Sequence, residues 1–462
     1  MAISSLPNKY GVGDFGPQSY KFIDYLKKAN MKIWQILPLN PVGYGNSPYQ
    51  SYSSYAMDEI YISLDLLKHD GLITSELIPF NDKKTFVDYD GCRKYKRKYL
   101  LEAFENFKKD SHYNKFCKEQ FWLDSWAYFM ASKRLNGLCI WYDFVNKPNN
   151  VQLEFERFLQ YILYKQWNLL KTHANKCGIK IMGDLPIYVG LDSEDVYSNP
   201  KVFLLDEDKR PKFVAGVPPD YFSPTGQRWG NPIYDWDYLE KTSFKFLKDR
   251  IEQNSKVFDI IRIDHFRAFD TYWKINAECD TAIDGEWCEA PGYKFFNYLF
   301  KVLPNVNIVV EDLGDIRKEV IDLKDYYKFK GMKVTEFHLT FDPLFSKDKK
   351  DLIIYTGTHD NATLKGWFYN LSKTNQRKIS KELNKNGFNY GRTLDNLIYY
   401  TFSSGACLAI IPMQDVLLLD NKYRMNTPST SGFPNWTFRL INYRNFAKRI
   451  PFLQHLIKTT KR

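Results

Sequence analysis

FDIIRID, residues 258–264, decides the fold of this sequence. It is a short, largely apolar run that ends in a carboxylate, and VNIVVE, residues 306–311, has the same form. Parallel barrel strands are buried on both faces and read as such runs, and the active sites of barrels lie at the C-terminal ends of the strands. The two runs therefore predict neighbouring strands that carry Asp264 and Glu311 to one face.

Similar runs recur along the chain, with helical patterns between them. A closed (β/α)8 TIM barrel needs eight strands, and residues 2–6 are the remaining candidate for the first, which we expect to be abbreviated. The predicted fold class is therefore α/β, a (β/α)8 barrel. The seven clear runs cover residues 33–38, 179–186, 258–264, 306–311, 332–338, 352–359 and 407–414.

The domain organisation follows from the gaps between these runs. We expect residues 1–462 to form a single catalytic barrel, because no repeat or low-complexity linker divides them. Residues 50–175 show helical patterns without barrel strands, which predicts a helical insertion subdomain. Residues 192–237 include VAGVPPDYFSPTGQRWGNP and predict a structured loop insertion over the active site.

Composition excludes several classes of protein. The net charge of +11 is not gathered into basic runs, so no nucleic-acid partner is expected. No apolar stretch of membrane-spanning length and no secretion signal is present, so we expect no membrane association. The seven cysteines form no Cys-x-x-Cys pair and indicate free thiols in a reducing, cytoplasmic location.

The strand ends carry the chemistry. Asp264 and Arg262 share one face of their strand, and the guanidinium is expected to keep the pKa of Asp264 low, as a nucleophile requires. Glu311 follows an apolar strand that can raise its pKa. Carboxyl groups on adjacent strand ends can approach to about 5 Å, the spacing of retaining glycosidases. The stretch YTGTHDNAT brings His359 and Asp360 to the same end of the predicted barrel, which we call its mouth.

Two other interpretations are open at this point. Each acid, taken alone, could cap the following helix or form an ordinary ion pair. A metal site built from Asp264, His265, His359 and Asp360 is the other chemical alternative, but the sequence has no His-x-His or His-Glu-x-x-His spacing to support it. We therefore expect no metal.

Several long motifs resemble glycoside hydrolase family 77, the amylomaltases and plant disproportionating enzymes. Family members normally carry a strand of the form Arg-x-x-Gly-Ile-Leu before the SSLP motif, and this chain lacks it. A late start codon, a truncation and an abbreviated strand would all give this pattern. The matching stretches are SSLPNKYGVGDFG, KIWQILPLNPVGYGNSPYQSYS, GDLPIYV, VAGVPPDYFSPTGQRWGNPIYDW, RIDHFRAF, VEDLG, GMKV, YTGTHDNAT, PMQDVL, RMNTP and NWTFRL.

The resemblance implies roles for individual residues. Asp264 would be the nucleophile, Glu311 the general acid and base, and Asp360 the stabiliser of the transition state. Arg262 would orient Asp264, and His359 would bond the sugar in the donor subsite. Asp184, Tyr49, Trp229 and Asn435 would be further sugar contacts, with Tyr221 and Phe222 on a mobile loop. The aromatic residues could instead be core residues, and Asn435 could stabilise a turn.

The implied activity is 4-α-glucanotransferase, which moves α-1,4-glucan segments from a maltooligosaccharide to glucose or another glucan without a cofactor. The alternatives are a hydrolase of the α-amylase type and a glucan-binding protein that has lost catalysis. The loop at residues 214–222 and the helical insertion argue against the first, and the three intact acids argue against the second.

Overall fold

The computed structural model describes residues 1–219, 223–339 and 351–462. Within these ranges, seven parallel strands follow one another in chain order. A bridge between Val309 and Lys330 joins the first four strands to the last three. The strands are β1 (Ile33–Gln35), β2 (Lys180–Leu185), β5 (Ile260–Ile263), β8 (Ile308–Val310), β9 (Gly331–Val334), β10 (Leu352–Tyr355) and β11 (Leu408–Ile410).

Each of the seven runs contains a strand, so the prediction of a barrel sheet is confirmed. Every strand is shorter than its run. The run at 332–338, for example, leaves the sheet after Val334 and continues as the short helix α12. The strands β5 and β8 are buried along their whole length, which explains why their sequences are continuously apolar apart from Arg262.

The expected short first strand at residues 2–6 is not formed. These residues make tight turns, in which Ser5 N–H donates to the Ala2 carbonyl and Leu6 N–H to the Ile3 carbonyl. Trp34 Nε1 donates to the Met1 carbonyl at 2.7 Å, so the segment packs beside β1 through side chains. The chain turns because the backbone groups of residues 2–6 bond locally and with residues such as Leu440.

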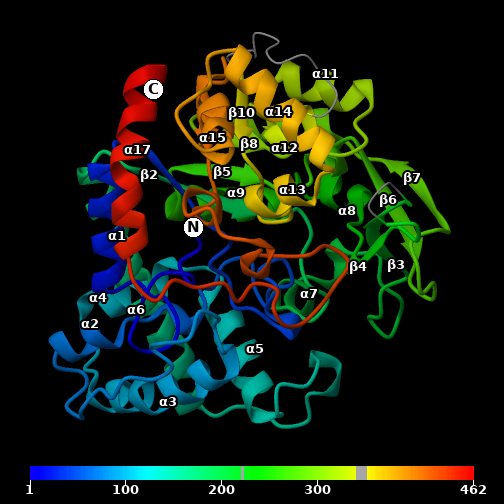
Figure 1. The fold of residues 1–462 in the computed structure, drawn as a ribbon. Helices are drawn as coiled ribbons and strands as arrows, with labels where there is room; N and C mark the ends of the chain where they lie inside the picture. Colours follow the sequence, from blue (N-terminus) through cyan, green and yellow to red (C-terminus); the bar gives the residue numbers. More distant parts are fainter. Residues whose placement is uncertain (220–222, 340–350) are drawn as a thin grey trace.

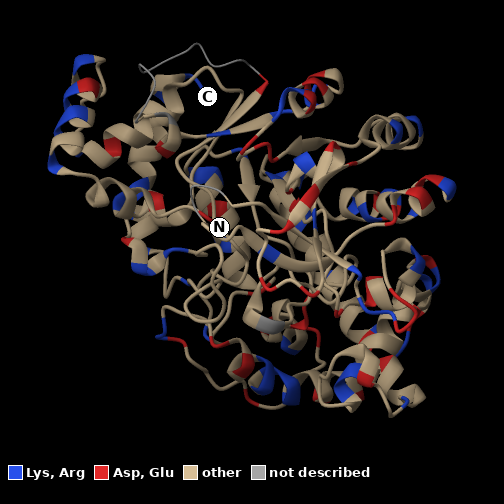
Figure 2. Ribbon diagram, turned by 90° about the vertical axis from the view of Figure 1, so that its right-hand side faces the viewer, with Lys and Arg blue, Asp and Glu red and all other residues tan. Residues whose placement is uncertain are grey.

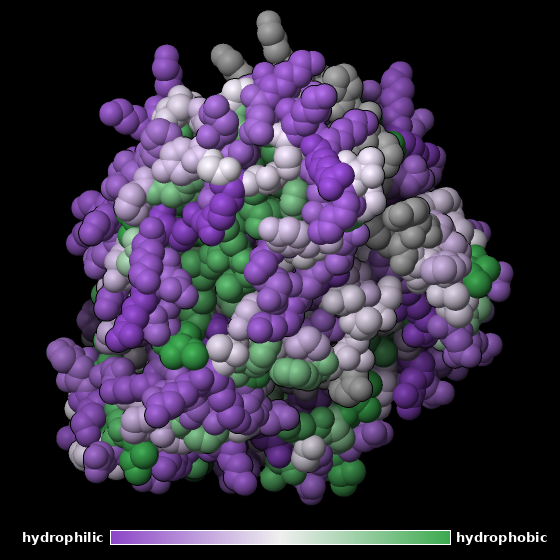
Figure 3. Space-filling view, in the orientation of Figure 1, coloured by the Kyte–Doolittle hydropathy of each residue, from purple (hydrophilic) through white to green (hydrophobic). Residues whose placement is uncertain are grey.

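An apolar cavity of about 660 Å³ lies between β1 and β11, where an eighth strand would close the barrel. Figure 3 shows this region as a hydrophobic hollow on the face of the molecule. Arg262 and His359 are among the residues that line the cavity. Its apolar lining includes Met1, Phe22, Leu26, Ile33, Leu408 and Leu453.

Helices surround the sheet (Figure 1). The long α6 packs against α1 and β2, although it begins inside the predicted insertion. Trp167 of α6 donates from Nε1 to the Val257 carbonyl at 3.0 Å, and its ring lies against Phe15 and Phe258. The last helix of the predicted insertion is therefore also a barrel helix.

The helices lie as follows. Those between β1 and β2 are α2 (Leu64–His69), α3 (Tyr89–Asn106), α4 (Ser111–Glu119), α5 (Leu123–Leu135) and α6 (Asn150–Lys176), and α1 (Pro17–Lys28) precedes them. The remainder are α7 (Glu194–Ser198), α8 (Trp236–Lys241), α9 (Lys245–Val257), α10 (Gly292–Val302), α11 (Lys318–Tyr326), α12 (Thr335–His338), α13 (Leu364–Asn370), α14 (Lys373–Lys385), α15 (Thr393–Ser403), α16 (Met413–Val416) and α17 (Arg444–Thr460). Short 3-10 turns cover Tyr44–Asn46, Glu59–Tyr61, Trp141–Asp143, Pro200–Val202, Phe266–Phe269 and Asn421–Tyr423.

A second, antiparallel sheet stands beside the barrel and was not predicted. It contains β3 (Phe213–Val217) and β4 (Gln227–Pro232) from the segment expected to be a loop insertion. It also contains β6 (Thr271–Asn276) and β7 (Gly285–Glu289), which follow β5 in the chain. The strand order is β4-β3-β6-β7, so two hairpins on either side of β5 in sequence pair with each other.

The surface carries charges of both signs. Figure 2 shows Lys and Arg spread over the outer helices among Asp and Glu, rather than gathered in one patch on the side in view. Among the helices in the described residues, none is long and apolar enough to cross a membrane.

A glycine in β2 gives a test of the packing. A Cβ built on Gly183 would lie 2.1 Å from the ring of Phe258, which is buried against Trp167. We expect Gly183→Ala to cost about 1–3 kcal/mol through overpacking and to lower the thermal unfolding midpoint. Phe258→Leu in the same chain should recover part of the loss. A Gly183→Ala protein as stable as the parent would contradict this packing.

Candidate active site

The guanidinium of Arg262 lies at the centre of the candidate site. Its Nη1 donates to both carboxylate oxygens of Asp184, at 2.7 and 2.8 Å, and to Asp264 Oδ1 at 2.8 Å. Arg262 and Asp184 are direct neighbours in the register of β5 and β2, so strand pairing brings them together. Tyr49 donates from its hydroxyl to Asp184 Oδ2 at 2.7 Å. Four of the predicted site residues thus form one hydrogen-bonded group.

Glu311 is held beside this group by main-chain donors. Its Oε2 accepts from the N–H of His265 at 2.9 Å, and its Oε1 accepts from the N–H of Leu313 at 2.8 Å. His265 is the residue after Asp264, so the bond links the carboxyl of Glu311 to the end of the strand that carries Asp264. The two candidate catalytic acids therefore lie at adjacent strand ends, as predicted.

The protonation of the two acids differs in part from the expectation. Burial, reinforced by the charge of Asp264, raises the pKa of Glu311 to about 7. Burial also raises the pKa of Asp264 to about 6, although the guanidinium of Arg262 opposes it. The expectation that Arg262 keeps the pKa of Asp264 low was wrong, because Arg262 is shared with Asp184 and does not offset the loss of water. The proton that the pair holds most strongly belongs to Glu311.

Asp360 has the opposite electrostatic environment. Its Oδ2 lies 3.3 Å from His359 Nε2, and its Oδ1 accepts from Asn426 Nδ2 at 2.7 Å. Burial opposes its ionisation, but these two partners hold the pKa of Asp360 at about 2. Burial likewise opposes a charged His359, yet the carboxylate of Asp360 raises the pKa of that ring. Asp360 is therefore a permanent negative charge at this mouth.

Aromatic rings join the two sides of the site. Tyr49 stacks on His359 with ring centroids 5.1 Å apart, and Trp436 packs against both rings at 5.6 Å. Trp229, in the middle of β4, lies edge-on to His265 with ring centroids 4.9 Å apart, and Gln50 Nε2 donates to the Trp229 carbonyl. The small sheet thereby reaches the residue next to Asp264.

The other predicted site residues lie differently. Asn435 is buried, and its amide group bonds to Thr427 and Thr430 of its own loop, as expected for a residue that stabilises a turn. Its contact with a sugar stays a prediction. Tyr221 and Phe222 lie outside the described residues.

The metal alternative finds no support in the arrangement of Asp264, His265, His359 and Asp360. Within residues 1–219, 223–339 and 351–462, no three of these side chains bring ligand atoms within 4.8 Å of one another. Asp264 is bonded to Arg262, and His265 packs on Trp229.

Two residues of the site were not singled out from the sequence. Asn426 fixes Asp360 and also donates its main-chain N–H to the His359 carbonyl at 3.1 Å. Trp436 completes the stack on Tyr49 and His359. Both occur in motifs quoted above, RMNTP and NWTFRL, but nothing in the motifs themselves says which side chain faces the acids.

Comparison with known proteins agrees with this geometry. The family model described as 4-alpha-glucanotransferase matches residues 1–443. The 4-alpha-glucanotransferase of Clostridium butyricum is 41% identical over 468 residues, covering 95% of each chain. The solved amylomaltase of Streptococcus agalactiae in complex with acarbose has a TM-score of 0.94 at 34% identity and covers 100% of this chain and 98% of its own. The amylomaltase of Corynebacterium glutamicum, at 16% identity and a TM-score of 0.78 over 100% of this chain and 74% of its own, shares the fold.

Asn426 offers a test of the site. Without its side-chain amide, Asp360 loses the donor that fixes Oδ1 and can rotate away from its working position. We expect Asn426→Ala to lower kcat for maltotriose about 10- to 100-fold, since small misplacements of catalytic groups have effects of this size. The control is Asn384→Ala, which removes an exposed asparagine on α14. Equal kcat values in the two variants would exclude a positioning role for Asn426.

Proposed function

Since the chain belongs to the 4-alpha-glucanotransferase family and transfers α-1,4-glucan segments, we propose a retaining double displacement in which Asp264 is the nucleophile and Glu311 the general acid and base. The observation that carries this proposal is the bond from the His265 N–H to Glu311, which links the two acids at adjacent strand ends. Retaining enzymes require a carboxyl pair close together.

In the first step, a lone pair of Asp264 attacks the anomeric carbon of the donor glucan. The bond from that carbon to the glycosidic oxygen breaks, and Glu311 gives its proton to the departing oxygen. The segment on the reducing side leaves, and a β-linked glycosyl ester remains on Asp264. The raised pKa of Glu311 supports this step, because the acid is still protonated near neutral pH.

In the second step, Glu311 is a carboxylate and accepts the proton of an incoming sugar hydroxyl. The 4-hydroxyl oxygen of the acceptor attacks the anomeric carbon, the ester bond to Asp264 breaks, and the α-linkage is restored. We propose glucose and maltooligosaccharides as acceptors. The acarbose bound to the Streptococcus agalactiae amylomaltase supports a glucan site of this kind.

The remaining predicted residues receive roles that follow from their contacts. Arg262 aims Asp264 through the bond to Oδ1. Asp360, ionised at all working pH values, would stabilise the positive charge that develops on the sugar ring. His359, Asp184 and Tyr49 would bond the donor sugar, and Trp229 would offer an apolar face to it. Asn435 remains a further candidate for contact with the sugar.

The two alternatives are weaker than transfer. A hydrolase of the α-amylase type would use the same acids. The Clostridium butyricum relative is a transferase, however, and it matches this chain over 95% of each sequence. A glucan-binding protein without catalysis would have no need for a protonated Glu311 beside an attacking Asp264. We also propose a cytoplasmic location, which the free cysteines support.

The pKa values of the pair predict a narrow pH optimum. Activity requires ionised Asp264 and protonated Glu311, so it should fall below about pH 6 as Asp264 gains a proton and above about pH 7 as Glu311 loses one. The two apparent values belong to the coupled pair. The measurement is kcat/KM against pH with maltotriose. In Glu311→Gln with an activated donor, which needs no acid, the alkaline limb should disappear. An alkaline limb that persists in this variant would assign the acid to another residue.

The products of maltotriose test transfer directly. Each transfer breaks one bond and makes another, so glucose and a ladder of longer maltooligosaccharides should form while the number of reducing ends stays nearly constant. Hydrolysis adds one reducing end at each event. Chromatography by chain length and a reducing-end assay on the same time course separate the two reactions. Reducing ends that rise in step with loss of maltotriose, without longer products, would refute transfer in favour of hydrolysis.

A further inference from the structure

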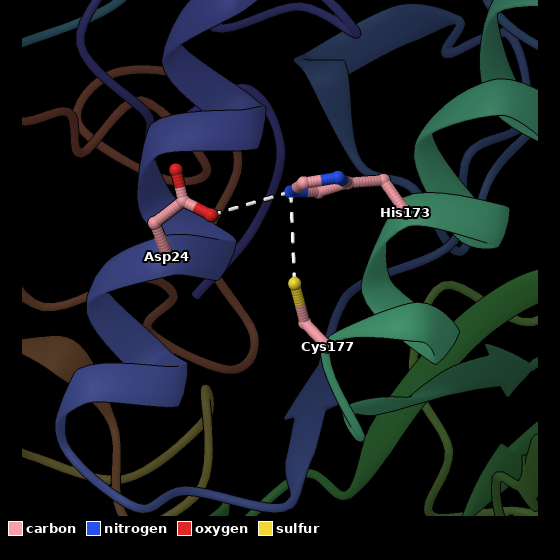
Figure 4. Close-up of side chains that lie close together, drawn as sticks. All are labelled: Asp24, His173 and Cys177. Atoms are coloured by element: carbon pink, nitrogen blue, oxygen red, sulfur yellow. Dashed lines mark hydrogen bonds and ion pairs between the residues drawn. The ribbon is translucent and has the colours of Figure 1, made fainter.

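Three side chains outside the barrel mouth converge between two helices. Asp24 lies on α1, His173 lies in the last turn of α6, and Cys177 follows the end of α6. His173 Nε2 is 3.3 Å from Asp24 Oδ1 and 3.8 Å from Cys177 Sγ, and Figure 4 shows both side chains directed at this one ring nitrogen. Across the described residues, this is the one group of three or more His, Cys, Asp or Glu with all ligand atoms within 4.8 Å of one another.

Hydrogen bonding explains this convergence only weakly, because a single Nε2–H would be shared between Asp24 Oδ1 and Cys177 Sγ, and sulfur is a weak acceptor. A nitrogen of a neutral imidazole carries either a hydrogen or a lone pair. With the hydrogen, Nε2 can donate to Asp24 but cannot accept from the thiol of Cys177. With the lone pair, it can accept from the thiol but repels the carboxylate. A catalytic relay is also excluded, because it would need Asp24 on the other ring nitrogen.

The spacing fits the edges of a tetrahedron around a zinc ion. Zinc binds nitrogen at about 2.0–2.1 Å, sulfur at about 2.3 Å and carboxylate oxygen at about 2.0–2.2 Å. At tetrahedral angles these lengths separate nitrogen from oxygen by about 3.4 Å and nitrogen from sulfur by about 3.6 Å. The corresponding distances are 3.3 and 3.8 Å. The two edges that meet at Nε2 therefore match a tetrahedral site to within a few tenths of an ångström, and Oδ1 and Sγ lie within 4.8 Å of each other.

We propose that Asp24 Oδ1, His173 Nε2 and Cys177 Sγ bind a Zn²⁺ ion, with water as the fourth ligand. A thiolate and an imidazole favour zinc, whereas Mg²⁺ and Ca²⁺ prefer oxygen ligands. The thiolate and the carboxylate balance the charge of the ion, and the carbonyl end of α6 adds partial negative charge. The side chains of His173 and Asp24 are 34% and 64% exposed, so the ion can enter from solvent.

The bound ion would fasten α1 to α6. Cys177 lies just before β2 begins, so the site is at the N-terminal end of the barrel strands, opposite the catalytic acids. The other side of α1 contributes Phe22 and Leu26 to the cavity between β1 and β11. The zinc would therefore hold in place a helix that lines the open side of the barrel, and its role is structural rather than catalytic.

Cobalt(II) in place of zinc tests the site directly. Protein freed of metal by a chelator is titrated with Co²⁺, and we expect thiolate-to-cobalt absorption in the near ultraviolet and the visible bands of tetrahedral cobalt, both saturating at one equivalent. Zn²⁺ should displace the cobalt, raise the thermal midpoint of the metal-free protein by several degrees and protect Cys177 from alkylation. X-ray absorption of the zinc form should show one sulfur ligand.

Variants assign the ligands. Cys177→Ser should abolish the near-ultraviolet band, and His173→Gln and Asp24→Asn should weaken binding at least tenfold. The matched control is Cys407→Ser, which removes an exposed cysteine and should leave the titration unchanged. The proposal is overturned if the parent protein binds no cobalt at one equivalent, or if the thiolate band survives in Cys177→Ser. Because the cobalt readout on the parent protein needs no variant, a variant that fails to fold leaves the proposal testable.

Discussion

The buried guanidinium of Arg262 is the constraint on which the site depends. A buried charge is very unfavourable unless it is paired, and removing a partner from such a pair is strongly destabilising. Arg262 meets this requirement with Asp184 on β2 and Asp264 on its own strand. A shift of β2 against β5 by one residue would turn Asp184 to the opposite face of the sheet. The guanidinium of Arg262 would then lose one of its two carboxylate partners. The same ion pairs therefore fix the strand register and the direction of the nucleophile.

Three carboxyl groups at one barrel mouth have three different pKa values, because burial raises each one and their charged and hydrogen-bonding partners offset it to different degrees. Asp360 is paired with the His359 ring and accepts a hydrogen bond from the amide of Asn426, so it is ionised at every working pH. Burial, reinforced by the charge of Asp264, raises the pKa of Glu311 despite two main-chain N–H donors, so Glu311 holds a proton near neutral pH. Asp264 lies between these extremes, with burial set against a guanidinium that it shares. The division of roles follows from hydrogen-bond partners rather than from residue type.

Much of this arrangement could be predicted from sequence, because the strand runs and the motifs are local. Asp264, Glu311 and Asp360 each end or follow an apolar run, and a barrel brings such ends together. The pairing of β6 with β3 could not be predicted, since TYWKIN is short and its partner strand lies about 60 residues earlier in the chain. The prediction of a low pKa for Asp264 was wrong for a related reason. Arg262 can be seen in the sequence, but the burial of Asp264 and the competition from Asp184 cannot. Residues 2–6 form turns where a strand was expected, because contacts with Trp34 and Leu440 decide their conformation.

The small sheet has a consequence for how this chain can vary. Its two hairpins, one before β5 and one after it, pair with each other and share no ladder with the barrel strands. The strands β3, β4, β6 and β7 thus form a module whose outline can change without disturbing the alignment of the parallel strands. The module meets the catalytic centre at the contact of Trp229 with His265. Selection on the shape of the glucan cleft can therefore act on one part of the sequence, while selection on the reacting carboxyl groups acts on another. One catalytic centre can in this way serve clefts of different outline.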